Sequence, residues 1–165
     1  MALHLIDDLK RFEGFRGKVY RCPGGRLTVG FGRNLEDNGV CVREAELLLL
    51  FDVAKVIEQL DTSMSYWRDF SAVVQCVLVQ MGFQLGVGGL LGFRKFLGAL
   101  RAGDLVQARA EMLNSLWARQ TPRRAEYLSN LLVHNSSESD TLVWEDSIDE
   151  LLFIVHRLKR MTLVK

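Results

Sequence analysis

The sequence predicts an α+β fold with a small β-hairpin lobe near the N-terminus and a mainly helical C-terminal lobe. Residues 19–35 combine β-branched and aromatic side chains with the turn Pro23-Gly24-Gly25, whereas most of the remaining chain places apolar residues at helical spacing. The chain has 165 residues, of which 48% are hydrophobic, which is enough to close one core. Strands confined to one segment, with helices elsewhere, are typical of the α+β class.

The first elements follow from apolar periodicity and turn residues. Residues 3–12 show the helical spacing, and Gly14 is expected to end that helix, so Glu13 should lie at its C-terminal end. A short twisted antiparallel hairpin is expected over residues 19–35. The broad apolar stripe of residues 43–60 predicts a long helix that joins two lobes or lines a core.

The later helices are delimited by breaks and caps. A buried helix is expected over about residues 70–81. Asp104 is placed to cap a helix over residues 105–113, and Thr121-Pro122 supplies an N-cap and a first helical residue for the next one. A final amphipathic helix is expected over residues 147–160.

These elements predict a single domain with two lobes. We expect a sheet lobe with its connecting helix over about residues 13–60, and a helical lobe over residues 61–132 that includes the first helix. Residues 133–165 form an extension with the amphipathic helix, which we expect to pack on the helical lobe rather than on a partner or a membrane surface.

Charge and cysteine content exclude several classes of function. The 21 basic and 20 acidic residues nearly cancel, so no overall field attracts nucleic acid. Three scattered cysteines without a C-x-x-C pair argue against a disulfide framework or a zinc site, and indicate thiols in a reducing compartment. No signal peptide is expected, because Asp7 and Asp8 interrupt the N-terminal apolar residues.

One uncharged stretch, residues 71–93, is long enough to span a membrane. Three glutamines would then lie in hydrocarbon, and the run GVGG from Gly86 would break a helix. A buried core helix followed by a turn is therefore favoured over a membrane span.

Three polar residues around the hairpin have the chemistry of a hydrolytic site. Glu13, partly desolvated, can stay protonated as a general acid and protonate a glycosidic oxygen. Glycoside hydrolysis needs a second group, which Cys22 can supply as a thiolate with Arg21 and Arg26 near it in sequence. Thr28 on the returning arm can hold a water molecule. Spacing alone does not distinguish this site from a helix-end glutamate, a turn cysteine and a strand threonine without a function.

The neighbouring residues favour the site. The segment FEGFRGKVYRCPGGRLTVGFGRNL, residues 12–35, closely resembles the active-site hairpin of the phage-type lysozymes, the endolysin family of the T-even phage lysozyme, whose pattern is Glu, eight residues, Asp or Cys, five residues, Thr. Three further blocks resemble the same family in the same order: LLFDV at 49–53, MGFQLGVGGLLGF at 81–93 and LWARQTPRRA at 116–125. The resemblance spans about residues 5–132, and four matched blocks are far more specific than one triad.

The resemblance implies a role for each matched residue. Glu13 is the general acid, Cys22 replaces the more familiar aspartate, and Thr28 positions water. Arg124 matches an arginine of the substrate site that pairs with the catalytic glutamate. Four further positions match residues that line the saccharide cleft: Gly32, Phe83, Gln84 and Trp117. The two aromatic residues among them can equally be core residues, because the walls of such clefts belong to the core.

Two departures from the family pattern matter. A thiolate at Cys22 leaves two mechanisms open, base-assisted attack of water with inversion or a covalent thioglycoside with retention, and Thr28 favours inversion. Arg33 stands where the family often has His, and an ion pair with Asp52 is expected to tie the hairpin to the following helix. Its contribution to stability should persist above neutral pH, because Arg does not titrate there.

The activity that the resemblance implies is that of a muramidase, which hydrolyses the β-1,4 bond between N-acetylmuramic acid and N-acetylglucosamine in peptidoglycan glycan strands. Neither a metal nor a cofactor is expected. In a phage setting the enzyme would stay in the host cytoplasm until a holin-dependent route released it to the cell wall, and a monomer is expected.

Two other classes of function are weighed against this one. The main alternative is a lysozyme-fold binding or regulatory module that has lost catalysis through the Cys22 substitution; Glu13 argues against it, because a pure binder needs no acid there. A hydrolase that pairs Cys22 with His134 or His156 has less support, because neither histidine has a supporting sequence context.

Overall fold

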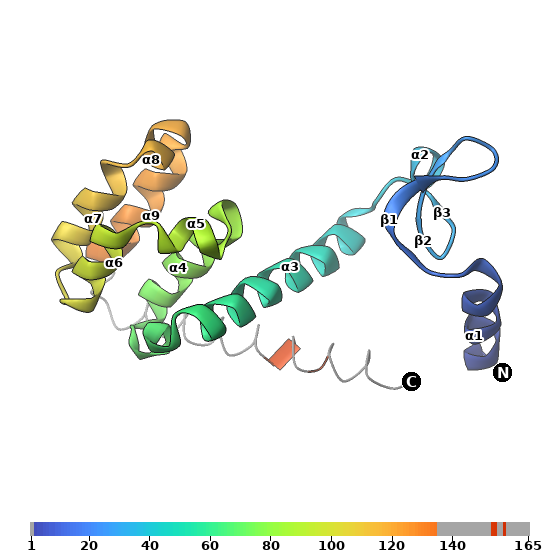
Figure 1. The fold of residues 1–165 in the computed structure, drawn as a ribbon, viewed down its shortest axis with the longest axis horizontal. Coiled ribbons are helices and arrows are strands. Elements are labelled where there is room, and N and C mark those ends of the chain that lie inside the picture. Colours follow the sequence, from blue (N-terminus) through green and yellow to red (C-terminus); the bar gives the residue numbers. More distant parts are fainter. Residues whose placement is uncertain (1, 135–152, 155–156, 158–165) are drawn as a thin grey trace. The chain divides into compact units, whose positions relative to one another are not determined.

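The computed structural model describes residues 2–134, 153–154 and 157, and Figure 1 shows their elements. Contacts divide the chain into two compact units, Met1–Leu47 and Leu48–Lys165, with the boundary inside helix α3. The assignment of the first helix to the helical lobe, and the lobe bounds 13–60 and 61–132, stay predictions.

The N-terminal unit contains two helices and a three-stranded antiparallel sheet with the strand order β1-β2-β3. Its elements are α1 (Ala2–Glu13), β1 (Arg16–Arg21), β2 (Leu27–Gly30), β3 (Arg33–Asn34) and α2 (Leu35–Asn38). Helix α1 ends at Glu13, as the sequence predicted. Gly14 follows with φ of 67°, and its N–H donates to the carbonyl oxygen of Lys10 at 3.1 Å, which is typical of a glycine that ends a helix.

The sheet is larger than the expected hairpin. Strand β1 begins at Arg16 rather than Val19, and the sequence did not predict β3 or α2. The Asn34 side chain caps α2, since its Oδ1 accepts from the backbone N–H groups of Glu36 and Asp37. Strand β2 is therefore the central strand, and Thr28 is paired on both sides.

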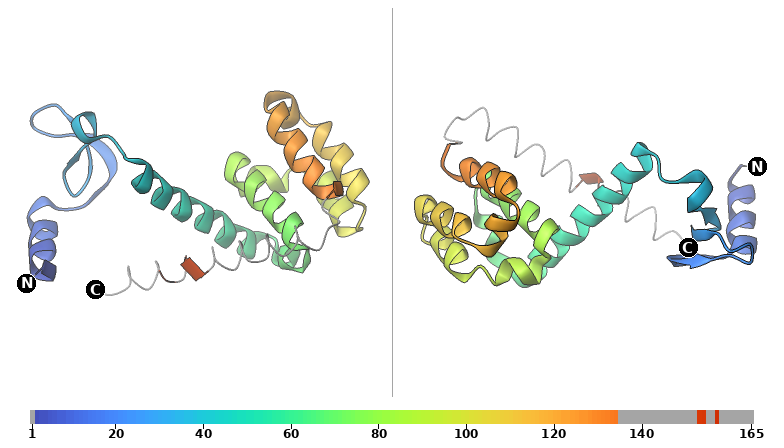
Figure 2. Two further views of the ribbon diagram at one scale, coloured as in Figure 1. Left: turned by 180° about the vertical axis from the view of Figure 1, so that it is seen from behind. Right: turned by 90° about the horizontal axis from the view of Figure 1, so that it is seen from above.

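The C-terminal unit is helical. After α3 (Val42–Ser63), it contains η1 (Ser65–Asp69), α4 (Ala72–Leu85), α5 (Val87–Leu91), α6 (Arg94–Arg101), α7 (Leu105–Leu113), α8 (Leu116–Gln120) and α9 (Pro122–His134). Helices α4 to α9 gather into one bundle in every view (Figures 1 and 2). The C-terminal half of α3 contributes Val56, Ile57 and Leu60 to a core that also contains Trp67, Leu78, Met81, Leu90, Phe96, Met112, Trp117 and Leu128.

Most of the helical predictions are confirmed, with shifted bounds. The helix expected at 70–81 is α4, which begins at Ala72 and continues to Leu85. Gly86, with φ of 72°, ends it, but the rest of the GVGG run is helical in α5, because one left-handed residue is enough to turn the chain. Asp104 caps α7 as expected, by accepting from the Gln107 N–H at 2.8 Å.

One predicted cap differs from the structure. Pro122 begins α9 as expected, but the Thr121 hydroxyl donates to the carbonyl oxygen of Trp117 at 3.0 Å in the preceding helix. The short helix α8 ends there, and its last turn offers a carbonyl oxygen within reach of this side chain.

Within the residues that the structure describes, no helix is both long and apolar enough to cross a bilayer. The uncharged stretch 71–93 is divided between α4 and α5, and its members Val77, Leu78 and Met81 are fully buried in the core. The expected helix at 147–160 lies outside the described residues except at 153–154 and 157, which are helical.

Candidate active site

Glu13 is the last residue of α1, and its carboxylate lies against Gly32. A Cβ at position 32 would stand 2.9 Å from Glu13 Oε2, and Gly32 has φ of 80°, so both space and backbone conformation favour glycine there. The two residues line a pocket of about 400 Å³ within the N-terminal unit, together with Ile6, Leu9, Lys10 and Phe31. The Glu13 side chain is exposed and open to a ligand, rather than partly desolvated as expected from the sequence, because it lies on the last residue of α1.

Cys22 begins the turn that joins β1 to β2. Its backbone N–H donates to the carbonyl oxygen of Arg26 at 3.0 Å, and its own carbonyl oxygen accepts from the N–H of Gly25 at 2.8 Å. A tight turn of this kind directs successive backbone N–H groups to one side, where they can stabilise an anion. The side chain of Cys22 is half-buried at this place.

Hydrogen-bond donors around the sulfur lower the pKa of Cys22 below its ordinary value. The largest contribution comes from the backbone N–H of Arg26, with smaller ones from the N–H of Gly24 and the hydroxyl of Thr28, while partial burial acts in the opposite direction. Among the interactions that shift the pKa of Arg26, attraction to the Cys22 thiolate is the weakest. The turn amides, rather than the arginine charges expected from the sequence, therefore favour the thiolate.

Thr28 is brought together with Cys22 by a shared partner. Its side chain is only 3% exposed, and its hydroxyl donates to the carbonyl oxygen of Arg26 at 3.0 Å, the same oxygen that accepts from the Cys22 N–H. A hydroxyl has one proton, so it donates either to this carbonyl oxygen or to the thiolate. Ionisation of Cys22 therefore changes the hydrogen bond that Thr28 makes.

The other two thiols differ from Cys22, although all three cysteines are free. Cys41 is exposed just before α3, whereas Cys76 is partly buried in α4, and burial raises the pKa of Cys76 to about 11. Cys22 should therefore react much faster than Cys76 at neutral pH. In the described part of the chain, no group of three or more His, Cys, Asp or Glu residues is arranged to hold a metal ion.

Arg33 has a partner that the sequence analysis did not identify. Its Nη1 and Nη2 donate to the two carboxylate oxygens of Glu44 at 2.6 and 3.0 Å, and its Nε donates to the carbonyl oxygen of Gly39 at 3.0 Å. Glu44 also accepts from the N–H of Cys41 at 2.9 Å, which is half of a capping box at the start of α3. Glu44 thus ties the hairpin to the next helix, the role expected of Asp52. Arg33 and Asp52 belong to different units, so a pair between them stays a prediction.

Replacing Glu44 with Gln should lower the melting temperature at pH 7. The Cys41 N–H, foremost, and Arg33 hold the pKa of Glu44 below its ordinary value in the folded state. A lowered pKa adds stability that is complete above the unfolded-state pKa and is lost as the pH falls through the folded-state pKa. The difference from the wild type should therefore close below about pH 4 and persist at alkaline pH. Exposed Glu46, replaced with Gln, is the matched control, and superimposable Glu44→Gln and wild-type melting curves at every pH would refute this role.

Three predicted cleft residues meet in the C-terminal unit. Gln84 Oε1 accepts from Trp117 Nε1 at 3.0 Å and from Arg124 Nη1 at 3.3 Å. Trp117 is 5% exposed, and its ring packs edge-on against Phe93 with the ring centroids 6.3 Å apart. Gln84 and Arg124 line a pocket of about 430 Å³ with Thr121, Pro122 and Arg123. Side chains of α4, α8 and α9 are thereby fixed at one place.

The remaining predicted residues are less constrained by the structure. Phe83 is exposed over 41% of its surface, so of the two cleft aromatics only Trp117 is enclosed by the core. Arg124 and Glu13 lie in different units, and their expected pairing stays a prediction.

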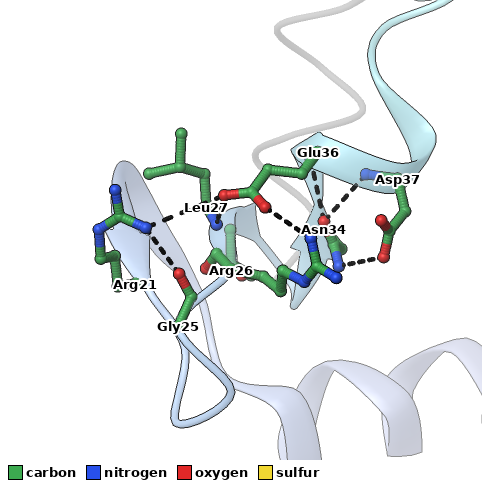
Figure 3. Close-up of polar contacts among 8 residues, drawn as sticks. Arg21, Gly25, Arg26, Leu27, Asn34, Glu36 and Asp37 are labelled. Atoms are coloured by element: carbon green, nitrogen blue, oxygen red, sulfur yellow. Dashed lines mark hydrogen bonds and ion pairs between the residues drawn. The ribbon is translucent and has the colours of Figure 1, made fainter.

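Sequence reasoning missed Phe31, Glu36 and Glu44. Phe31 lines the pocket of Glu13, and the Glu36 side chain reaches from α2 to Arg26 and Leu27 at the end of the Cys22 turn (Figure 3). The sequence does contain a pattern for the two helix starts near Glu36 and Glu44. Asn34 stands three residues before Asp37, and Cys41 stands three residues before Glu44, which is the spacing of a helix N-cap and its partner.

Comparisons with known proteins relate this chain to lysozymes and an endolysin. The phage lysozyme family model matches residues 10–132. The pre-baseplate central spike protein Gp5 of Enterobacteria phage T4 is 27% identical, in a match that covers 83% of this chain and 29% of that protein. The probable T4-type lysozyme 1 of Dictyostelium discoideum is 24% identical over 80% of this chain and 95% of its own length. The endolysin of Acyrthosiphon pisum secondary endosymbiont phage 1 is 34% identical over 64% of this chain and 72% of its own length.

The chain thus spans less than a third of the spike protein but most of the length of the lysozyme and the endolysin. The family match covers most of the chain and includes Glu13, the Cys22 turn and the Gln84 cluster, which consists of Gln84, Trp117 and Arg124. The small antiparallel sheet followed by a helical bundle agrees with the lysozyme-like α+β fold that the resemblance implied. The chain therefore belongs to the phage lysozyme family, as a glycoside hydrolase whose substrate class is peptidoglycan.

Proposed function

We propose that this protein is a muramidase that hydrolyses the β-1,4 bond between N-acetylmuramic acid and N-acetylglucosamine in peptidoglycan glycan strands. The observation that carries the proposal is that one small unit contains both the exposed carboxylate of Glu13 and a thiol at Cys22 whose pKa is lowered by the turn around it. Such a pair fits the two groups that glycoside hydrolysis requires. Host cell-wall degradation by a monomer, after holin-dependent release from the host cytoplasm, belongs to the same proposal.

Glu13 serves as the general acid. Its carboxyl proton passes to the glycosidic oxygen as the bond to the sugar carbon breaks, and positive charge develops on that sugar ring. Because Gly32 has no side chain, the space beside Glu13 stays free for the saccharide.

Cys22 serves as the base. A water molecule, held by the Thr28 hydroxyl, attacks the anomeric carbon from the face opposite the leaving oxygen, while its proton passes to the thiolate. The products are two shorter glycan strands with inverted configuration at the new reducing end. The alternative is direct attack by sulfur, which would form a thioglycoside and give retention.

The Gln84 cluster serves to hold the saccharide. Gln84 uses its Oε1 for two protein donors, so its amide NH₂ is the group it can offer to an acetamido carbonyl oxygen. Arg124 keeps further donors beyond the one that it gives to Gln84, and these suit hydroxyl or carboxylate oxygens of the glycan.

The experiment that tests the proposal is digestion of purified peptidoglycan under reducing conditions, with the products resolved by mass. We expect fragments that end in reducing N-acetylmuramic acid, and nuclear magnetic resonance at early times should show the α-anomer first if the reaction inverts. Fragments that end in reducing N-acetylglucosamine, or cut only in the peptides, would contradict the proposal. No release by a folded protein would favour the glycan-binding module instead.

A further inference from the structure

Glu36 links helix α2 to the turn that carries Cys22. Its Oε2 accepts from Arg26 Nη1 at 2.9 Å, and its Oε1 accepts from the backbone N–H of Leu27 at 3.1 Å (Figure 3). Arg21 Nη1 stands 3.9 Å from Glu36 Oε1 and donates to the carbonyl oxygen of Gly25 at 2.7 Å. The Glu36 carboxylate therefore binds the Arg26 side chain and the Leu27 N–H, and the Arg21 guanidinium lies beside it.

The Leu27 N–H needs this acceptor because β3 is too short to supply one. Strand β3 pairs with β2 only at Thr28 and Val29, so Leu27 extends past the last residue of β3. Glu36 lies on the first turn of α2, directly after β3, and its side chain takes the place that a longer strand would fill. The start of β2 is thus fixed by a side chain rather than by a strand.

The residue held in this way, Arg26, is the main partner of Cys22. The Arg26 carbonyl oxygen accepts from the Cys22 N–H and from the Thr28 hydroxyl, both at 3.0 Å. The Arg26 N–H is also the largest cause of the lowered pKa of Cys22. The Arg26 carbonyl oxygen and the Leu27 N–H that Glu36 binds belong to the same peptide group, so a rotation of that peptide would disturb the contacts of Cys22 and Thr28 together.

We propose that Glu36 is a positioning residue for Cys22: by holding the Arg26 side chain and the peptide group that joins Arg26 to Leu27, it fixes the carbonyl oxygen that Cys22 and Thr28 share and keeps the two residues side by side. This inference rests on the proposed function, in which the Cys22 thiolate is the second catalytic group. The hydrogen bond from Arg26, foremost, keeps the pKa of Glu36 below its ordinary value, so the link is intact at neutral pH.

The test is the rate of Cys22 alkylation by iodoacetamide across pH, measured on the full-length protein. Trypsin cuts after Arg21 and Arg26, so the peptide of residues 22–26 reports Cys22 apart from Cys41 and Cys76. Glu36→Gln should move the midpoint of the rate profile up by about one pH unit, because an amide oxygen can serve only one of the two donors and its NH₂ opposes the other. Loss of the Glu36 charge alone would favour the thiolate and move the midpoint down, so an upward shift indicates lost positioning.

Asp37→Asn is the matched control. Asp37 neighbours Glu36 in α2 and acts on Arg26 by charge, but its carboxylate accepts from the Asn34 side chain at 2.7 Å rather than from the turn. The midpoint in this variant should stay within about 0.3 pH unit of wild type or fall slightly. An unchanged midpoint in Glu36→Gln, or equal shifts in both variants, would overturn the inference.

Glu36→Asp provides the same test if Glu36→Gln does not fold, because it keeps the charge and shortens the side chain by one methylene. We expect a smaller upward shift in this variant, and no shift would overturn the inference. The readout needs no turnover: an inactive wild type with a shifted Glu36→Gln profile would refute the proposed function alone. An active wild type with unshifted profiles would refute the positioning role alone.

Discussion

Replacing Glu13 with Gln is expected to reduce peptidoglycan cleavage by about 100- to 10,000-fold, because the amide keeps the shape of the side chain but cannot supply the proton that the glycosidic oxygen needs. The fold should not change, since the side chain is exposed at the end of α1. The measurement is the initial rate of muropeptide release at equal protein concentration, with circular dichroism as the folding check.

Asp8→Asn is the control for this variant. Asp8 lies on the same helix, and its ion pair with Arg11 at 3.5 Å, the one that the described residues show for it, is exposed, so its loss should leave the rate within about twofold of the wild type. A Glu13→Gln rate that matches Asp8→Asn would remove Glu13 from the chemistry.

Replacing Cys22 with Ala is expected to cost about 100- to 10,000-fold in rate, because no group then takes the proton from the attacking water. Cys22→Asp should keep activity, since a carboxylate can serve as the same base. The base must be deprotonated while Glu13 is protonated, so one limb of the pH–rate profile follows the pKa of residue 22. A carboxylate titrates near 4, whereas an ordinary thiol titrates near 8.5 and this one somewhat lower, so that limb should move down by a few pH units in Cys22→Asp.

The pH–rate profiles of wild type and Cys22→Asp, measured in a thiol-containing buffer, check this prediction. Coincident profiles, with neither limb moved, would mean that the group at position 22 does not take part in the reaction. Activity only in Cys22→Asp, from an inactive wild type, would identify a lapsed enzyme.

Local features of the sequence were sufficient to predict where the helix that carries Glu13 ends and where the helix that Asp104 caps begins. The end of α1 follows from apolar spacing and a glycine, and the start of α7 from an aspartate that precedes it. Strand β3 could not be predicted, because two residues have no periodicity. Its existence nevertheless puts Thr28 in the middle of the sheet and leaves the Leu27 N–H to Glu36.

The candidate site was located by resemblance, and its physical causes were not visible in the sequence. Arg21 and Arg26 were expected to favour the Cys22 thiolate by charge, but the direction of the turn amides matters more, and that direction exists only once the turn is folded. Gln84 contacts Trp117, which lies 33 residues later in the chain, and Arg124, which lies 40 residues later. No local pattern predicts contacts at such separations, whereas the family motif placed all three residues in one cleft.

The most direct test of the central claim, that Cys22 is a working catalytic group, is a titration of the full-length enzyme with iodoacetamide after the reductant has been removed. Remaining activity is plotted against the alkylated fraction of Cys22, with the alkylation of Cys41 and Cys76 followed in the same digests. Activity should fall in proportion to Cys22 alkylation, while Cys22→Asp should keep its activity under the same treatment. An enzyme fully alkylated at Cys22 and still fully active would contradict the account.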